Sequence, residues 1–246
     1  MTGYSDVVLT IASSTARALL GRRRTLLMLL LAGAPVLLGL LVQLGNGPRP
    51  RVVVPSLEGL IITSVLPLVA LVFGTAALGS ELDDGTAVHI LTKPIPRWTI
   101  VVPKVAVAGG LTALLLVPST VLAGILIGGT GSRELGITAA FTVAVLIGSF
   151  VYAAIFVALS AATSRGLVIG LGYSLLWEGL LSGALPGTQL FSVREHLRGI
   201  VSVVAPPDTL ESVVGATGLV LALVTIVVVT GLASMRLARF QVRAAE

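Results

Sequence analysis

The sequence predicts an all-α integral membrane protein with six transmembrane helices. Of its 246 residues, 55% are hydrophobic and only 11% are charged, whereas a soluble domain carries about 25% charged residues. The mean hydropathy is +1.05, and the long apolar runs lack the alternation of a β-barrel strand. Because helices and closed barrels satisfy their backbone hydrogen bonds in hydrocarbon, we expect one helical membrane domain over residues 1–246.

The six spans follow from apolar runs of about the length that crosses a bilayer. Near the start of three of them, a serine or aspartate is followed two or three residues later by a glutamate, which is typical of a helix N-terminus. Three contain a proline, which predicts a kink. The expected spans are roughly Thr25–Leu44, Leu57–Leu78, Val105–Gly128, Leu135–Ala158, Leu167–Leu185 and Thr209–Ser234. The start signals are Ser56 with Glu58, Ser132 with Glu134 and Asp208 with Glu211, and the prolines are Pro35, Pro67 and Pro118.

The segment before the first span, from Ser5 to Gly21, carries apolar residues at roughly helical spacing with polar residues among them. This pattern predicts an amphipathic helix in the membrane surface. A cytoplasmic extension of the first span explains it equally well. A signal peptide is disfavoured, because the apolar run Thr25–Leu44 is long enough to span and no small-x-small cleavage site follows it.

The placement of lysine and arginine predicts the orientation, since basic residues gather on the cytoplasmic side. With six spans, eleven bases fall on one side and five on the other, so both termini and the segment between spans two and three are predicted to be cytoplasmic. The richer side holds Arg17, Arg22, Arg23, Arg24, Lys93, Arg97, Lys104, Arg165, Arg236, Arg239 and Arg243. The poorer side holds Arg49, Arg51, Arg133, Arg194 and Arg198.

The stretch from Gly79 to Lys104 is the longest polar interruption among the first apolar runs. Within it, residues 85–91 are predicted to form two helical turns, with Asp83 or Asp84 at their N-terminus. The helix is expected to end by Lys93, because the residue before Pro94 disfavours helical geometry. Its apolar face, which includes Val88 and Leu91, needs the bilayer surface or a partner protein to cover it.

At these residues the chain resembles the permeases of ATP-binding cassette (ABC) exporters of the second type. The shared pattern is Glu81-Leu82-Asp83-Asp84-Gly85-Thr86, followed by Leu91, Pro94, Arg97 and Lys104. The resemblance implies that this stretch is the coupling helix, which docks Val88 and Leu91 into a cytosolic ATPase. A capped helix in an ordinary cytoplasmic loop is the alternative interpretation.

The segment between the last two spans also contains a predicted helix. Ser192 and Glu195 form a capping box, and Pro206 and Pro207 end the helix. Its apolar stripe consists of Val193, Leu197, Ile200 and Val204. About a dozen residues cannot cross a bilayer, so this helix should lie at the outer surface or dip back in. The resemblance implies short re-entrant helices here, and an ordinary loop on the membrane is the alternative.

Motifs for catalysis within this chain are absent from the sequence. The two lysines, Lys93 and Lys104, do not follow a glycine-rich loop, so no Walker A motif exists. The two histidines, His89 and His196, fall on opposite sides of the predicted topology, and there is no cysteine. We therefore expect no enzymatic activity, cofactor, metal or nucleic-acid binding in this chain. ATP and Mg²⁺ are expected in the partner ATPase.

Glu178 is the one acid within an apolar run. A charge inside a membrane marks a functional site by default, so Glu178 is a candidate for the translocation path, for proton transfer or for pairing with a base. The nearby Trp177 and Pro186 suggest instead that the span ends here and that Glu178 lies in the outer headgroup region with a structural or gating role.

These observations favour the membrane-spanning permease of an ATP-driven ABC exporter in the plasma membrane. The resemblance implies two copies of a cytosolic ATPase and a second permease, in a homodimer or a heterodimer. The apolar spans favour a hydrophobic or amphipathic substrate moved out of the cytoplasm or the inner leaflet. The alternatives are an ion- or proton-coupled secondary transporter that uses Glu178, and a membrane assembly protein without transport.

Overall fold

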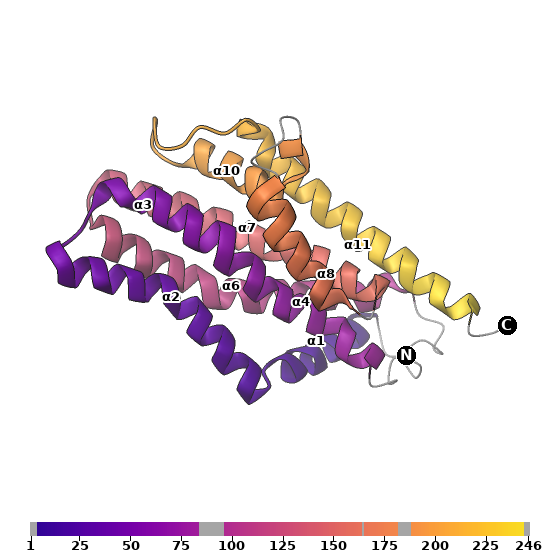
Figure 1. Ribbon diagram of the computed structural model, residues 1–246. Helices are drawn as coiled ribbons and strands as arrows, with labels where there is room; N and C mark the ends of the chain where they lie inside the picture. Colours follow the sequence, from indigo (N-terminus) through magenta and orange to yellow (C-terminus); the bar gives the residue numbers. More distant parts are fainter. Residues whose placement is uncertain (1–3, 84–95, 164, 182–187, 244–246) are drawn as a thin grey trace.

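The computed structural model describes residues 4–83, 96–163, 165–181 and 188–243, and the regular structure in these ranges is helical. Long helices lie side by side in one bundle (Figure 1). They are α2 (Arg22–Asn46), the continuous run of α3 (Pro50–Ser56), η1 (Leu57–Val65) and α4 (Leu66–Asp83), α6 (Trp98–Gly128), α7 (Ser132–Ala162) and α11 (Gly218–Arg243). The prediction of an all-α membrane protein is confirmed.

Five described helices are long and apolar enough to cross a membrane, not the six expected. They are Thr25–Gly45, Pro50–Gly79, Trp98–Gly128, Ser132–Ala162 and Gly215–Ala238. The expected fifth span, Leu167–Leu185, corresponds to α8 (Gly166–Gly172) and the π-helical η2 (Tyr173–Leu181). Its apolar helical part, Gly166–Glu178, is shorter than a usual span, and residues 182–187 are outside the described ranges.

Two predicted helix starts, those of the second and sixth spans, are wrong, and a third helix begins before its expected span. The second span begins at Pro50, since a proline suits the first helical turn, so Ser56 lies inside the helix and caps nothing. The third span begins at Trp98, seven residues before the expected Val105. The sixth begins at the short η4 (Gly215–Thr217) and not at Thr209, because Asp208 has a φ of 60° and does not start a helix.

The central helix of the bundle is α7, which packs against α4, α6, α10 (Val193–Val204) and α11. Glycines allow neighbouring helices to approach it closely. A side chain at Gly74 would meet Phe156 of α7, and one at Gly148 of α7 would meet Leu197 of α10. Such contacts between small and large residues drive helix association where lipid surrounds the protein, because apolar burial alone gives little gain there.

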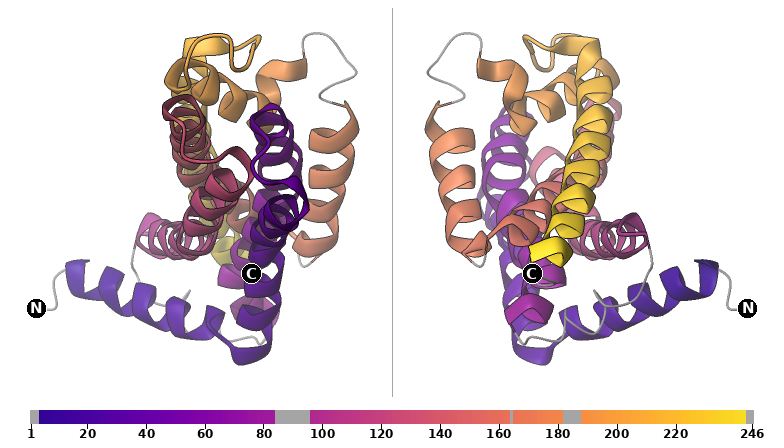
Figure 2. Two further views of the ribbon diagram at one scale, coloured as in Figure 1. Left: turned by 90° about the vertical axis from the view of Figure 1, so that its left-hand side faces the viewer. Right: turned by 90° about the vertical axis from the view of Figure 1, so that its right-hand side faces the viewer.

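The N-terminal helix α1 (Tyr4–Leu19) forms as predicted and is separate from α2. It projects sideways from one end of the bundle (Figure 2). Thr15 and Leu19 are buried, whereas Leu9 is exposed. The helix is thus separate from the first span, and its position along the membrane surface stays a prediction.

The helix α10 lies at the end of the bundle opposite α1 (Figure 2). Val193, Leu197 and Ile200 of its predicted apolar stripe are buried, but Val204 at its C-terminal end is half-exposed. The helix packs against α7 and α11, and its re-entrant position in the membrane stays a prediction. On its α11 side, Gly199 and Gly218 lie backbone to backbone, since a Cβ on Gly199 would stand 3.2 Å from the Cα of Gly218.

Candidate functional site

The predicted coupling segment falls in the sequence between α4 and α6. Glu81 and Asp83 are in the last described turn of α4, and Arg97 directly precedes α6. The remaining predicted coupling residues lie outside the described ranges: Asp84, Gly85, Thr86, Val88, Leu91 and Pro94. The coupling helix therefore stays a prediction, while the two helices that flank it are described.

A buried lysine joins these two flanking helices. Lys104 is fully buried, and its Nζ donates a hydrogen bond of 2.6 Å to the carbonyl oxygen of Ala77 near the end of α4. The predicted cytoplasmic position of Lys104 stays a prediction, but α6 begins before the expected Val105, so Lys104 lies within the helix and not in the segment before it. A charge buried in this way is costly unless hydrogen bonds compensate it, so the contact fixes α4 against α6.

Glu178 is buried with 1% of its surface exposed, and its carboxylate contacts the start of α10. Oε1 accepts hydrogen bonds from the Tyr173 hydroxyl at 2.7 Å and from the backbone N–H of Val193 at 2.9 Å. Oε2 accepts hydrogen bonds from the Ser192 hydroxyl at 2.7 Å and from the backbone N–H of Arg194 at 3.1 Å. Both carboxylate oxygens thus accept from donors that are buried or part-buried.

These contacts complete the N-terminus of α10. The first N–H groups of a helix have no partner inside it, and they carry partial positive charge. Glu178 accepts the first two, and the Ser192 hydroxyl accepts the third, that of Glu195, at 3.4 Å. The predicted capping box is confirmed for Ser192, whose hydroxyl accepts from the backbone N–H of Glu195. The Glu195 side chain, however, pairs with Arg198 at 3.3 Å.

A second acid joins α10 to the N-terminal half of the bundle. Glu58 lies in η1, and its Oε1 forms ion pairs with Arg194 at 3.0 Å and Arg198 at 3.5 Å. These side chains are only partly buried. In the sequence Glu58 reads only as a helix-start signal, because nothing in the sequence places η1 beside α10.

Both acids lie in π-helical segments, Glu58 in η1 and Glu178 in η2. In η1, the hydroxyls of Thr63 and Ser64 bind the carbonyl oxygens five residues before them, at 3.0 Å each. π-Helical turns are rare and occur often at functional sites. Here they aim two carboxylates at the same short helix, and no sequence pattern signals them.

The described residues contain no cluster of three histidine, cysteine or acidic side chains that fits a metal ion. Comparison with known proteins gives one result: the family model of the ABC-2 family transporter protein matches residues 4–242. No curated protein matches the chain. The match covers nearly the whole chain and agrees with a helical, multi-pass membrane architecture. The chain therefore belongs to the ABC-2 family, as a membrane-spanning permease that associates with an ABC ATPase and is not itself the ATPase.

Proposed function

We propose that this permease exports a hydrophobic or amphipathic substrate from the cytoplasm or inner leaflet. Two copies of a cytosolic ATPase bind ATP and Mg²⁺ and drive the transport. Two permeases, identical or similar, form the pathway in the plasma membrane, and both termini of this chain face the cytoplasm. The larger share of bases at the end of the bundle that holds Arg17, Arg97 and Arg236 supports this orientation.

The observation that carries this proposal is the contact between Lys104 and Ala77. It ties α4 to α6 next to the two ends of the segment that resembles a coupling helix. Because the two helices are fixed to each other, a force applied to residues 84–95 acts on both helices at once. ATP-driven movement would thus reach the centre of the bundle, where α4 and α6 pack against α7.

For Glu178 we propose a positioning role and not a role in substrate or proton transfer. Its carboxylate accepts four hydrogen bonds, from Tyr173 in η2 and from the start of α10. A carboxylate bound by four donors keeps the start of α10 in one place. A secondary transporter that used Glu178 would instead need this carboxylate to exchange its partners during transport.

The test is to coexpress the chain with its ABC ATPase and to purify the complex in mild detergent. Native mass measurement should show two permeases with two ATPases, and export in vesicles should require ATP. An active complex with one copy of this chain and no second permease would overturn the proposed assembly. Transport driven by an ion gradient without the ATPase would favour the secondary transporter. ATPase binding without any transport would favour an assembly protein.

A further inference from the structure

The first membrane-length helix, α2, changes direction along its length (Figure 1). Pro35 lies inside it, and a proline within a helix removes one backbone hydrogen bond and bends the axis. The helix packs mainly against α6. Its buried residues recur every three or four positions and so lie on one narrow face: Met28, Ala32, Pro35 and Gly39. The bundle therefore holds α2 along one side only.

The two halves of α2 are held to α6 in different ways. After the proline, Gly39 lies so close to α6 that a Cβ on it would stand 2.7 Å from the Cβ of Leu126. Before the proline, Met28 and Ala32 are buried, and the Ser119 hydroxyl of α6 donates a hydrogen bond to the carbonyl oxygen of Ala32. Close packing thus fixes the second half, whereas a polar contact holds the first.

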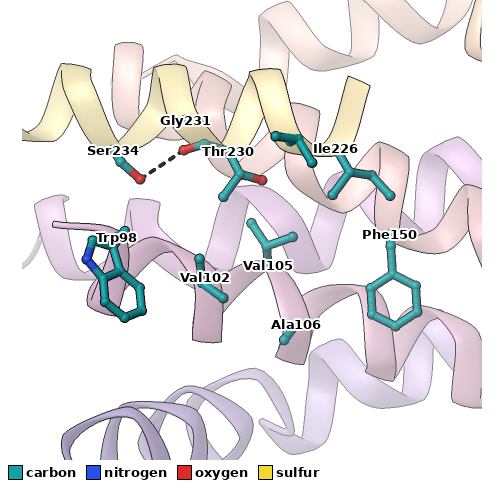
Figure 3. A pocket seen from close by; sticks show the side chains of 10 residues that line it. Trp98, Val102, Val105, Ala106, Phe150, Ile226, Thr230, Gly231 and Ser234 are labelled. Atoms are coloured by element: carbon teal, nitrogen blue, oxygen red, sulfur yellow. Dashed lines mark hydrogen bonds between the residues drawn. The ribbon is translucent and has the colours of Figure 1, made fainter. Parts of the chain in front are cut away.

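The Ser119 hydroxyl can release Ala32 without losing a hydrogen bond. Other hydroxyls in these helices donate to the carbonyl oxygen four residues earlier, as Thr112 does at 2.8 Å and Ser234 at 2.9 Å (Figure 3 shows the bond of Ser234). Rotation of its side chain lets Ser119 donate to Leu115 in the same way. The Ala32 carbonyl oxygen lies within α2, where the N–H four residues later is its helical partner. Separation here therefore leaves neither group unpaired.

Separation of the first half of α2 from α6 also costs little in other contacts. In a membrane, lipid chains replace the apolar contacts that a helix loses. A single hydrogen bond between membrane helices changes an equilibrium by only about threefold on average. Gly21 lies between α1 and α2, outside both helices, so α2 can turn while α1 keeps its contact with α6.

We propose that Pro35 is a hinge and that the Ser119 hydroxyl is its releasable catch. In the closed form, which the structure shows, Ser119 binds Ala32 and holds residues 22–34 against α6. In the open form, Ser119 donates to Leu115, and residues 22–34 swing away from α6 into the lipid while the second half of α2 stays in place. This exchange belongs to the permease alone and requires neither the ATPase nor a substrate. It therefore stands or falls separately from the proposed export.

The test measures distances between two spin labels on the full chain in lipid nanodiscs, since the chain contains no cysteine to interfere. One pair joins Leu30→Cys, in the first half of α2, to Leu146→Cys on α7. The control pair joins Leu41→Cys, in the second half, to the same position on α7. All three side chains are exposed. Pulsed electron–electron resonance should give two distances for the first pair and one for the control pair. One narrow distance for both pairs, or two for both, would overturn the hinge.

Two variants and one matched control separate the catch from the hinge. Ser119→Ala removes the catch, so the ratio of the open to the closed distance should rise about threefold in the first pair. Pro35→Ala restores a helical N–H and stiffens α2, so a single distance should remain. Thr112→Val removes a hydroxyl bound within α6 and should leave the ratio unchanged. Unchanged distances in both Ser119→Ala and Pro35→Ala, or an equal rise in Thr112→Val, would overturn the proposal.

Discussion

The carboxylate of Glu178 lies 2.9 Å from the backbone nitrogen of Val193, so an acid in η2 caps a helix that begins fifteen residues later. This contact explains why a charged residue occurs in an otherwise apolar run. It also attaches α10 to η2, at the end of the bundle that we propose to be outside.

Replacing Glu178 should destabilise the permease. Glu178→Ala leaves two helix N–H groups and two hydroxyls without their acceptor, and we expect a loss of about 1–3 kcal/mol or more in unfolding free energy. Glu178→Gln should lose less, because its amide oxygen still accepts. Thermal unfolding in detergent measures both variants. Glu211→Gln, at an exposed acid, is the control. If Glu178→Ala and Glu178→Gln melted at the same temperature as the control and the wild type, the capping role would be contradicted.

Replacing Lys104 should loosen the contact between α4 and α6. Lys104→Met keeps the length and loses the hydrogen bond to Ala77, so we expect a cost of about 1–3 kcal/mol in unfolding free energy. We also expect the complex to hydrolyse more ATP for each substrate molecule exported, because the two helices no longer move together. The matched control is Arg165→Met, at an exposed base, which should change stability by less than about 0.5 kcal/mol.

The predicted topology can be tested with single cysteines, since the chain contains none. An impermeant thiol reagent added to intact cells should label Asn46→Cys, Gly131→Cys and Thr188→Cys. It should label Thr86→Cys only after the membrane is opened. Labelling of Thr86→Cys from outside would reverse the proposed orientation.

The coupling role of residues 81–91 predicts a specific defect. A charge at position 88 cannot enter an apolar groove of the ATPase, and loss of one buried anchor typically costs about 1–4 kcal/mol of binding. Val88→Asp should therefore reduce copurified ATPase and abolish export, while the permease stays in the membrane. Glu178→Gln should retain the ATPase. Normal ATPase binding and export by Val88→Asp would remove the main argument for a coupling helix here.

The helical membrane class could be predicted from the sequence because long apolar runs have few alternative structures in lipid. Helix starts were less predictable. Ser56 looked like a cap, but Pro50 and the apolar residues after it extend the helix toward the N-terminus. The start at Thr209 failed because Asp208 adopts a left-handed conformation.

The partners of the polar residues could not be predicted in the same way. Glu178 stands out in the sequence as an acid within an apolar run, but donors such as Ser192 and Val193 belong to a separate helix start, and their contact depends on tertiary packing. The π-helical turns that place Glu58 and Glu178 beside α10 follow no residue pattern. Lys104 was judged by its neighbours in sequence, whereas its partner Ala77 lies on another helix.

The backbone contact between Gly199 and Gly218 limits how this part of the chain can change during evolution. A larger residue at one position cannot be offset by a smaller one at the other, because glycine is already the smallest. A Cβ at Gly199 would approach the carbonyl oxygen of Gly215 to 2.6 Å, and backbone atoms cannot move aside as a flexible side chain can. We therefore expect that homologues sharing this helix pairing hold glycine at both positions. Homologues that lost either glycine should have α10 displaced from α11.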